Sequence, residues 1–392
     1  MIGLWLLMAL VFSACYKEPT GPRPRFEHWE HLAEVPKPKE PLSQVLKILI
    51  WRDYLDPQVI ESFEKRYRTK IEITYFENNA ELKQIFAAKP NEFDLLMPSD
   101  YIVERFITEK TLAPIRKENI PNMGYIKQDL FRTPYDPELI YSVPIFHSCL
   151  GITFNFRELQ HIPRDFTLRS SINQENLRLH GYRALIDEPR VALSAALLDD
   201  KVDPNAPTAE ALAATADRLV KDTIEMGIHF YASALPERMI KNEIAIAVNW
   251  SGGAAVAAQK NPNIRFVLPQ GIKLVQVDSF VIPLTSTRRY TAEFFLNYLL
   301  IPEISGALTN YSLYANSNAN SRPFISREIL LGPAYMEPPQ TQRIFLADLG
   351  PLEAEFERQW NRVKNAVPTP KAKIPSLMKQ KEEQQLKQDL EH

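Results

Sequence analysis

Cysteine, glycine and net charge are all low in this sequence of 392 residues. It has two cysteines and 12 glycines against 31 prolines, so we expect stiff connecting segments and stability that comes from packing rather than from disulfides. Lys and Arg total 46 against 48 Asp and Glu, a formal charge of −2. This balance excludes the basic surface of a nucleic-acid or anionic-membrane binder and leaves a small or cationic ligand open.

A long hydrophobic run is also missing. The apolar stretch at residues 2–11, within MIGLWLLMALVFSAC, is too short to span a bilayer, and we interpret residues 1–15 as a signal peptide. Small residues directly before Cys15 resemble a lipobox, so Cys15 is expected to be lipidated and to anchor the protein in the periplasm or on the outer face of the cytoplasmic membrane. A plain signal peptide or an anchor is the alternative. With Cys15 lipidated, Cys149 stands alone and no intramolecular disulfide can form.

Two polar segments flank the expected folded region. Residues 16–45 are rich in Pro and charge, which predicts a tether between membrane and domain. Residues 367–392 form a polar tail, interpreted as a solvated end, with a partner-binding helix as the alternative. Folded structure is therefore expected within residues 46–366, which is long enough for two lobes with a substantial core.

Short β-rich runs alternate with helical patterns inside these limits. Strands are expected at 46–51, 71–75 and 93–97, with a helical pattern at 58–67. This order predicts a parallel sheet covered on both faces, and thus an α/β fold. A second lobe is expected to begin near residue 153 and to contain elements at 184–186, 208–221 and 244–249. A strand at 275–282 and a helix at 290–300 are expected to return to the first lobe.

Aromatic and acidic residues recur at the ends of the expected strands, where open α/β sheets bind ligands. Trp51, Asp53 and Tyr54 follow the first strand. Carboxylates, most of them without an adjacent Lys or Arg, can neutralise ammonium groups. Aromatic faces can cover methylene groups and add about 0.5–2 kcal/mol each through cation–π attraction. The pattern predicts a site for a flexible diamine or triamine, and its later members are Ser99, Tyr101, Asp187, Glu188, Trp250, Asp278 and Tyr314.

Purely structural roles stay open for these side chains. The aromatic residues could pack in the core. Asp53 could cap the following helix, and Asp278 could occupy a turn. Asp187 could pair with Arg190.

From about residue 46 to 366 the sequence resembles the spermidine/putrescine-binding proteins of polyamine ABC importers. The segments that carry the resemblance are, in order, IWRDYL, DLLMPSDYIVERF, YSVPIFHSCLGITFN, DEPR, AVNWSGGAA, VDSFVIP, FLNYLLIPEISG and LYANSNA. The resemblance implies an α/β, two-lobed type II periplasmic-binding-protein fold. Each lobe would be a central, mostly parallel sheet flanked by helices, with the ligand cleft between the lobes.

The resemblance also implies roles for individual residues. Ser99 would contribute a hydroxyl contact, and Asp53, Glu188 and Asp278 would bind amine nitrogens. The aromatic cage would consist of Trp51, Tyr54, Tyr101, Trp250 and Tyr314.

Several positions depart from the family pattern. Val191 stands where the family has a carboxylate, Gln276 where it has Trp, and Leu346 where it has Gln. These changes should weaken or redirect recognition of one ammonium end, because an amine there would lack its counter-charge. His147 and Ser148 also differ, and we expect His147 to be packed, with a ligand contact as the alternative.

The function that the resemblance implies is that of a monomeric solute-binding component of an ABC importer. It would bind a polyamine, close around it by a hinge, and deliver it to a permease with its ATPase, without a cofactor or metal. The hinge is expected at 145–153, 275–281 and 321–325. The lobes would then be 46–152 with 278–322, and 153–277 with 323–366.

Three alternatives remain at this stage. The protein could report polyamine to a membrane receptor, or it could bind another amine or an amino acid. It could also be a hydrolase with a Ser or Cys149 nucleophile. The sequence has no nucleophile elbow, metal-spaced His/Cys cluster or phosphate loop, so we predict a binding protein rather than an enzyme.

Overall fold

The computed structural model describes residues 36–127, 133–159 and 181–366. The expected signal peptide with Cys15, most of the expected tether, and the tail at 367–392 lie outside these residues. Among the residues described, no helix is long and apolar enough to cross a membrane.

The strands join into one mixed sheet. Its main path runs in the order β2-β1-β3-β9-β4-β7-β5-β6, and β8, β10 and β11 attach beside this path. The strands are β1 (Val45–Trp51), β2 (Lys70–Phe76), β3 (Leu95–Leu96), β4 (Ser142–Asn155), β5 (Arg183–Ile186), β6 (Ile228–Tyr231), β7 (Ile246–Trp250), β8 (Ile264–Val267), β9 (Lys273–Val281), β10 (Ala315–Asn316) and β11 (Arg343–Ile344).

Strands β4 and β9 connect the two halves of the sheet. They pair antiparallel, and every residue of both strands is buried. In the outer parts, β1 pairs parallel with β2 and β3, and β5 pairs parallel with β6 and β7. The expected parallel pairing thus holds on each side. It fails at the centre, where a long strand passes from one half to the other and its partner returns in the opposite direction.

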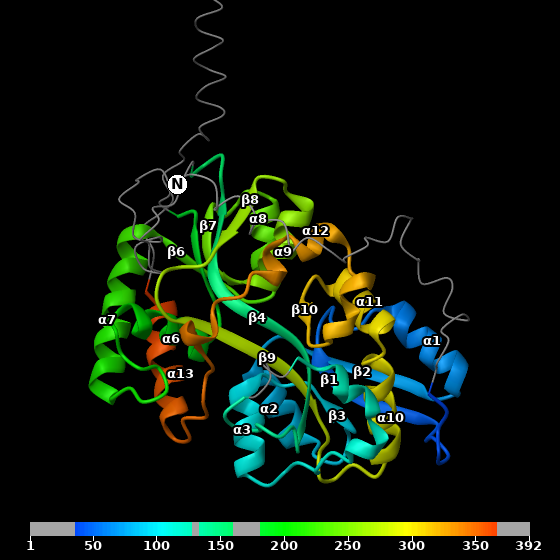
Figure 1. The fold of residues 1–392 in the computed structure, drawn as a ribbon. Coiled ribbons are helices and arrows are strands. Elements are labelled where there is room, and N and C mark those ends of the chain that lie inside the picture. Colours follow the sequence, from blue (N-terminus) through cyan, green and yellow to red (C-terminus); the bar gives the residue numbers. More distant parts are fainter. Residues whose placement is uncertain (1–35, 128–132, 160–180, 367–392) are drawn as a thin grey trace, which may run out of the picture.

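Helices surround both halves of the sheet (Figure 1). One half carries α1, α2, α3, α10 and α11, and the other carries α6, α7, α8, α9 and α13, with β4 and β9 running between the two groups. The helices are α1 (Pro57–Tyr67), α2 (Asn79–Ala88), α3 (Asp100–Thr108), α6 (Pro189–Asp199), α7 (Ala209–Met226), α8 (Leu235–Ile240), α9 (Ser251–Lys260), α10 (Arg289–Leu299), α11 (Pro302–Ser312), α12 (Arg327–Leu330) and α13 (Leu352–Lys364).

The apolar core is continuous across the two halves. One cluster lies within the first half, between α1, α10, α11 and the β1 side of the sheet, and includes Phe63 and Phe295. A larger cluster extends from Phe106 on α3 through Leu150 on β4 to Trp360 on α13. Because these side chains exclude water along the length of the sheet, the two halves are stabilised together.

The chain is ordered by contacts slightly before the expected start of the fold. The backbone N–H groups of Lys39 and Glu40 donate to the hydroxyl of Tyr290, at 2.5 and 3.2 Å. The N–H of Ser43 donates to Thr291 Oγ1 at 2.9 Å. The end of the expected tether therefore lies against α10, and β1 begins at Val45.

Local sequence explains how the chain leaves β1 toward the first helix. Asp53 has a φ of 61°, a left-handed conformation that reverses the chain direction after the strand. Asp56 then caps α1 by accepting a hydrogen bond from the Gln58 N–H at 2.8 Å, and Pro57 occupies the first helical turn. Asp56, and not Asp53, is thus the capping residue, which leaves Asp53 available for another role.

Candidate functional site

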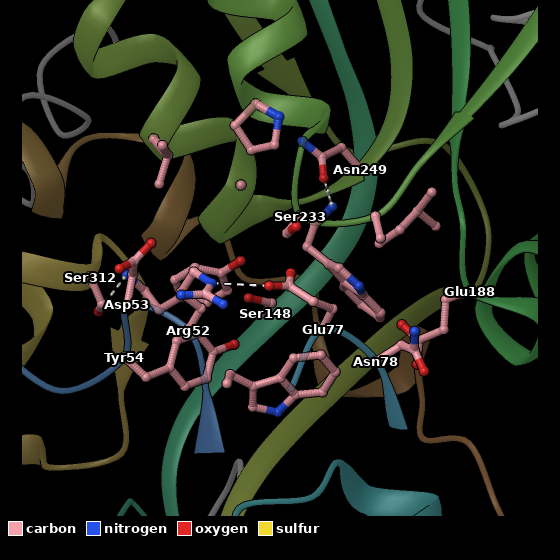
Figure 2. Close-up of a pocket in the computed structure, with 18 of the residues that line it drawn as sticks. Arg52, Asp53, Tyr54, Glu77, Asn78, Ser148, Glu188, Ser233, Asn249 and Ser312 are labelled. Carbon is pink, nitrogen blue, oxygen red and sulfur yellow. Dashed lines mark hydrogen bonds and ion pairs between the residues drawn. The ribbon is translucent and has the colours of Figure 1, made fainter. Parts of the chain in front are cut away.

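A pocket of about 340 Å³ lies between the two halves of the molecule (Figure 2). It is bounded by the ends of β1, β2, β5 and β7, by β4 and β9, and by α8, α9 and the end of α11. Six of the nine predicted ligand-binding residues line it, and these are Trp51, Asp53, Tyr54, Glu188, Trp250 and Tyr314.

Aromatic rings form one wall of this pocket. Trp51, the last residue of β1, lies 6.5 Å from Tyr54 between ring centroids, and Tyr54 lies 4.9 Å from Tyr314. Trp250 ends β7 and is 7% exposed. Gly252, at the start of α9, allows Tyr314 to approach, because a Cβ at this position would lie 2.3 Å from the Tyr314 ring. The wall can cover the methylene groups of a ligand and face a cation.

Asp278 lies behind this wall, in the middle of β9 rather than in a turn or at a strand end. Its carboxylate accepts hydrogen bonds from Tyr54 OH at 2.9 Å, Ser99 Oγ at 3.0 Å and Gln276 Nε2 at 2.9 Å. Burial raises the pKa of Asp278 to about 6, although these three donors favour the charged form. Asp278 does not line the pocket directly, and it acts on it through Tyr54 and Gln276.

Glu188 projects into the same pocket from the opposite half of the molecule. It follows β5 and is the N-cap residue of α6. Its Oε1 accepts hydrogen bonds from Asn79 Nδ2 at 3.0 Å and from Tyr101 OH at 3.2 Å, so it contacts α2 and α3 across the cleft. Burial raises the pKa of Glu188 to about 7. The predicted residues Ser99 and Tyr101 thus reach the site through the two carboxylates.

Helix N-termini compensate part of the cost of burying these carboxylates. Ser99, Glu188 and Trp250 are the N-cap residues of α3, α6 and α9, so three helices begin around the site. The positive end of a helix dipole and its unpaired N–H groups favour nearby negative charge. Acidic residues therefore occupy an interior position that would otherwise strongly disfavour them.

Asp53 lies at the pocket mouth and is exposed. Its neighbour Arg52 pairs with Glu77 at 3.0 Å, and a dashed line marks this pair in Figure 2. Lys260 is the other cationic residue in the lining. The lining also contains acidic residues in excess over these two cations, namely Asp53, Glu77, Asp187, Glu188 and Glu237.

The predicted departures from the family pattern have different positions. Gln276 lines the pocket and donates to Asp278, so it takes part in the site. Val191 and Leu346 are buried in the apolar core, and neither lines the pocket. His147 is also packed, with its Nε2 at 3.2 Å from Glu337 Oε1, and burial lowers its pKa. Ser148 lines the pocket.

Asn79 is the main residue that sequence reasoning missed. Its side-chain amide donates to both Ser99 Oγ and Glu188 Oε1 at 3.0 Å, which joins the Asp278 and Glu188 clusters. Asn78 and Glu77 line the pocket beside it. All three follow β2 directly. The strand-end rule that was used for the first strand would have identified them if it had also been used for this second strand. The alternative considered for Asp187, an ion pair with Arg190, does not form among the described residues. Asp187 instead contacts Trp360 Nε1 and Lys364.

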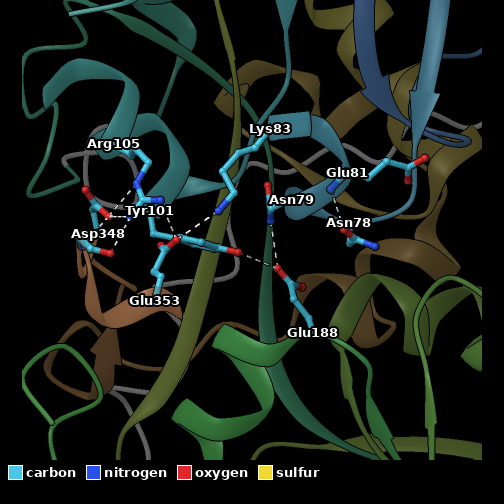
Figure 3. A network of polar contacts seen from close by, with 10 residues as sticks. Asn78, Asn79, Glu81, Lys83, Tyr101, Arg105, Glu188, Asp348 and Glu353 are labelled. Atoms are coloured by element: carbon cyan, nitrogen blue, oxygen red, sulfur yellow. Dashed lines mark hydrogen bonds and ion pairs between the residues drawn. The ribbon is translucent and has the colours of Figure 1, made fainter. Parts of the chain in front are cut away.

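A second polar network holds the two halves together beside the pocket (Figure 3). Arg105 on α3 contacts Asp348 at 2.6 Å and Glu353 of α13 at 2.9 Å. Lys83 on α2 also contacts Glu353, at 3.2 Å. Glu353 thus forms ion pairs with two helices of the opposite half. We call Arg105, Lys83, Asp348 and Glu353 the α13 latch.

The thiol of Cys149 is not poised for nucleophilic attack. Cys149 is buried, and burial raises the pKa of its thiol to about 12, so the reactive thiolate is suppressed. Within the described ranges, no group of His, Cys, Asp and Glu is arranged to hold a metal ion. What the geometry provides is an acidic pocket with aromatic walls, which suits reversible binding of a cation.

Residues 58–331 match the family model for bacterial extracellular solute-binding proteins. The chain belongs to this family. Members are solute-binding proteins, which are not a class of enzyme. The expected resemblance to polyamine-binding members is confirmed by the relatives found.

Two relatives that are named for polyamine binding match most of this chain and most of their own length. The putrescine-binding periplasmic protein PotF of Escherichia coli is 25% identical over 343 residues, which cover 82% of this chain and 92% of the relative. The spermidine/putrescine-binding periplasmic protein of the same organism is 24% identical over 281 residues, covering 71% and 79%. The solved structure of a spermidine/putrescine ABC transporter protein from Listeria monocytogenes matches with a TM-score of 0.76 at 25% identity, covering 83% and 100%. These matches confirm the two-lobed solute-binding-protein fold.

Proposed function

We propose that this solute-binding protein binds an aliphatic polyamine, of the putrescine or spermidine type, between its lobes and delivers it to an ABC permease with its ATPase. The observation that carries the proposal is the convergence of Asp278 and Glu188 behind aromatic walls. Relatives named for putrescine and spermidine binding support the ligand class.

Electrostatics favour a cationic ligand over a neutral one. Two buried carboxylates with raised pKa values become easier to ionise when an ammonium group approaches, because the ligand supplies a counter-charge in place of the hydration that burial removed. The rings of Trp51, Trp250 and Tyr314 exclude water from the pair, which strengthens it. A micromolar ligand needs only about −8 kcal/mol, which a few such contacts provide.

Binding is proposed to close a hinge, without a chemical reaction and without a cofactor. The lobes are 46–152 with 278–322, and 153–277 with 323–366. Hydrogen bonds from Asn79 and Tyr101 to Glu188 join these lobes beside the pocket, so ligand and protein contacts can stabilise one closed state. The closed surface would be recognised by the permease. We further propose a monomer anchored to the membrane by lipid on Cys15.

Thermal unfolding with added ligands tests this function. Putrescine, cadaverine, spermidine or spermine at about 100 times its Kd should stabilise the purified protein by about 2.7 kcal/mol, and thus raise its Tm by several degrees. Hexanediol, which has no ammonium group, is the matched control and should leave the Tm unchanged. No shift with any amine at millimolar concentration would refute the proposal.

A further inference from the structure

An ion pair in the pocket wall joins the ends of the first two strands. Trp51 and Phe76, the last residues of β1 and β2, lie opposite each other in the parallel register, and Arg52 and Glu77 are the next residues on the two strands. Arg52 Nε donates to Glu77 Oε1 at 3.0 Å, and both residues line the pocket. Figure 2 shows their side chains pointing toward each other. A cation of the protein itself thus lies in the wall of the ligand pocket.

Both members of this pair keep their charge. The Arg52 guanidinium also lies over the Tyr75 ring, 5.1 Å from its centroid, an arrangement that favours a cation. Arg side chains stay protonated at every pH at which a protein is folded. The hydroxyl of Ser233, from the segment between β6 and α8, lowers the pKa of Glu77, and Arg52 lowers it further. The pair is therefore ionised on both sides and has no net charge.

Two other acids of the lining also have a cation of the protein as partner. Asp187 contacts Lys364 at 3.1 Å, and Glu237 contacts Lys241 at 3.0 Å. Each of these cations balances a negative charge that would otherwise face the ligand. Three of the five acidic residues in the lining are therefore already neutralised, if the pair of Arg52 and Glu77 is included.

The carboxylates that form no ion pair among the described residues are Asp53 and Glu188 in the lining and Asp278 behind it. The hydrogen bonds to Glu188 and Asp278 come from neutral hydroxyl and amide groups. Lys260, the last residue of α9, is the remaining cation of the lining. With both buried acids ionised, these three carboxylates and Lys260 leave a net charge of −2. Two ammonium groups balance this charge, and a third exceeds it.

We propose that the pair of Arg52 and Glu77 limits the ligand to two ammonium groups, so that the protein prefers a diamine to a triamine. This inference rests on the proposed polyamine-binding function and narrows its ligand class. Asp53, Glu188 and Asp278 supply the charge that a diamine needs. A third ammonium group in the pocket would lie near the Arg52 guanidinium, where like charges repel and the Glu77 carboxylate is already paired.

Calorimetry with putrescine, spermidine and N-butylputrescine tests the inference. N-butylputrescine has the chain length of spermidine, but it has a methyl group in place of the third ammonium group. The two ligands therefore differ in charge and not in length. The unmodified protein should bind N-butylputrescine about 10-fold or more tighter than spermidine, because only spermidine brings a positive charge toward Arg52. Putrescine should also bind tighter than spermidine.

Variants of the pair separate its charge from its shape. Arg52→Gln leaves Glu77 free for an ammonium group and should raise the affinity for spermidine about 10-fold relative to N-butylputrescine. Arg52→Lys keeps the positive charge and should keep the preference of the unmodified protein. Combining Arg52→Gln with Glu77→Gln should abolish the gain for spermidine, because the freed carboxylate is then missing. Lys65→Gln is the matched control, since it removes the same charge from an exposed pair with Glu61 on α1 and should leave the affinity ratio unchanged.

The failures of the two proposals are distinguishable. Spermidine binding as tightly as N-butylputrescine, or tighter, would overturn this inference and leave the polyamine-binding function intact. An unchanged affinity ratio in Arg52→Gln would also overturn it. If that variant does not fold, Glu77→Gln decides, because the unpaired guanidinium should weaken spermidine about 3-fold or more relative to N-butylputrescine, and an unchanged ratio contradicts the inference. Absence of binding by all three ligands and by spermine would overturn both proposals.

Discussion

Asp278 and Glu188 show how carboxylates reach the site from both halves of the molecule. Both are buried acids, but Asp278 is held by three donors within β9 and its surroundings, whereas Glu188 is held by Asn79 and Tyr101 across the cleft. Asp278 is therefore a preformed acceptor, while the contacts of Glu188 depend on how the two halves approach each other.

Replacing Asp278 by Asn should remove amine binding and leave the fold intact. The substitution keeps the shape but removes the negative charge that lies behind Tyr54 and Gln276 and attracts the ammonium group, a loss that typically costs about 2–5 kcal/mol. Calorimetry should show putrescine affinity falling at least about 30-fold, with a Tm within a few degrees of the unmodified protein. Asp217→Asn is the control, because Asp217 is an exposed partner of Arg362. Retained affinity in Asp278→Asn would remove Asp278 from the site.

Ligand affinity should fall as pH decreases from about 8 to 5. Burial raises the pKa of Glu188 to about 7 and that of Asp278 to about 6, so each loses its charge as the pH falls through its value. The amine remains protonated throughout this range. Calorimetry at several pH values measures the effect, and Glu188→Gln should flatten the part of the profile near pH 7. A pH-independent Kd would contradict the assignment.

The same shifts set the sign for the ligand-free protein. The folded-state pKa of Glu188, about 7, lies above its usual value of 4.5. Between these two pH values the folded state therefore binds more protons than the unfolded state. Stability from this group is fully present below about 4.5 and is lost as the pH rises through about 7. The Tm of the free protein should therefore fall as the pH rises from about 4.5 to about 7, and bound amine should offset this fall.

At the scale of elements, α13 connects the two halves. It packs on α6 and α7, Trp360 donates to Asp187 at 2.7 Å, and Glu353 contacts Arg105 and Lys83. The α13 latch is only partly exposed, with the Arg105 side chain 17% and the Glu353 side chain 10% accessible. It should therefore contribute more than a surface ion pair.

Arg105→Ala should weaken ligand binding without touching the pocket. Losing the contacts to Asp348 and Glu353 removes stabilisation from the closed state, so ligand release should accelerate and affinity should fall about 5- to 30-fold, or about 1–2 kcal/mol. Stopped-flow fluorescence measures the release rate. Arg358→Ala removes an exposed pair within α13 and should have no effect. An unchanged release rate in Arg105→Ala would show that the latch does not act on closure.

For the molecule as a whole, continuity of the sheet and core decides cooperativity. β4 and β9 belong to both halves, and one apolar cluster extends across them. We expect a single unfolding transition by calorimetry, with equal calorimetric and van't Hoff enthalpies. Two resolved transitions would show that the lobes unfold independently.

Much of this architecture could be predicted from sequence, because the relevant signals are local. Periodicity located the strands around Leu49 and Ala184 and the helix that became α7. The strand-end rule located Trp51, Glu188 and Trp250, which the pocket brings together. The same rule also selects Asp278, but this residue lies within β9 and not at its end, so the reason for selecting it is wrong. Asp278 nevertheless lies next to the pocket, where it accepts a hydrogen bond from Tyr54.

What the sequence alone determined is the set of elements, the family and the acidic and aromatic residues that lie near the cleft. Only the tertiary structure decided that β4 and β9 pair antiparallel at the centre and that Asn79 joins Ser99 to Glu188. The reason is physical. A hydrogen bond between residues about 100 positions apart depends on how the halves approach each other, and no local pattern of residues carries that distance.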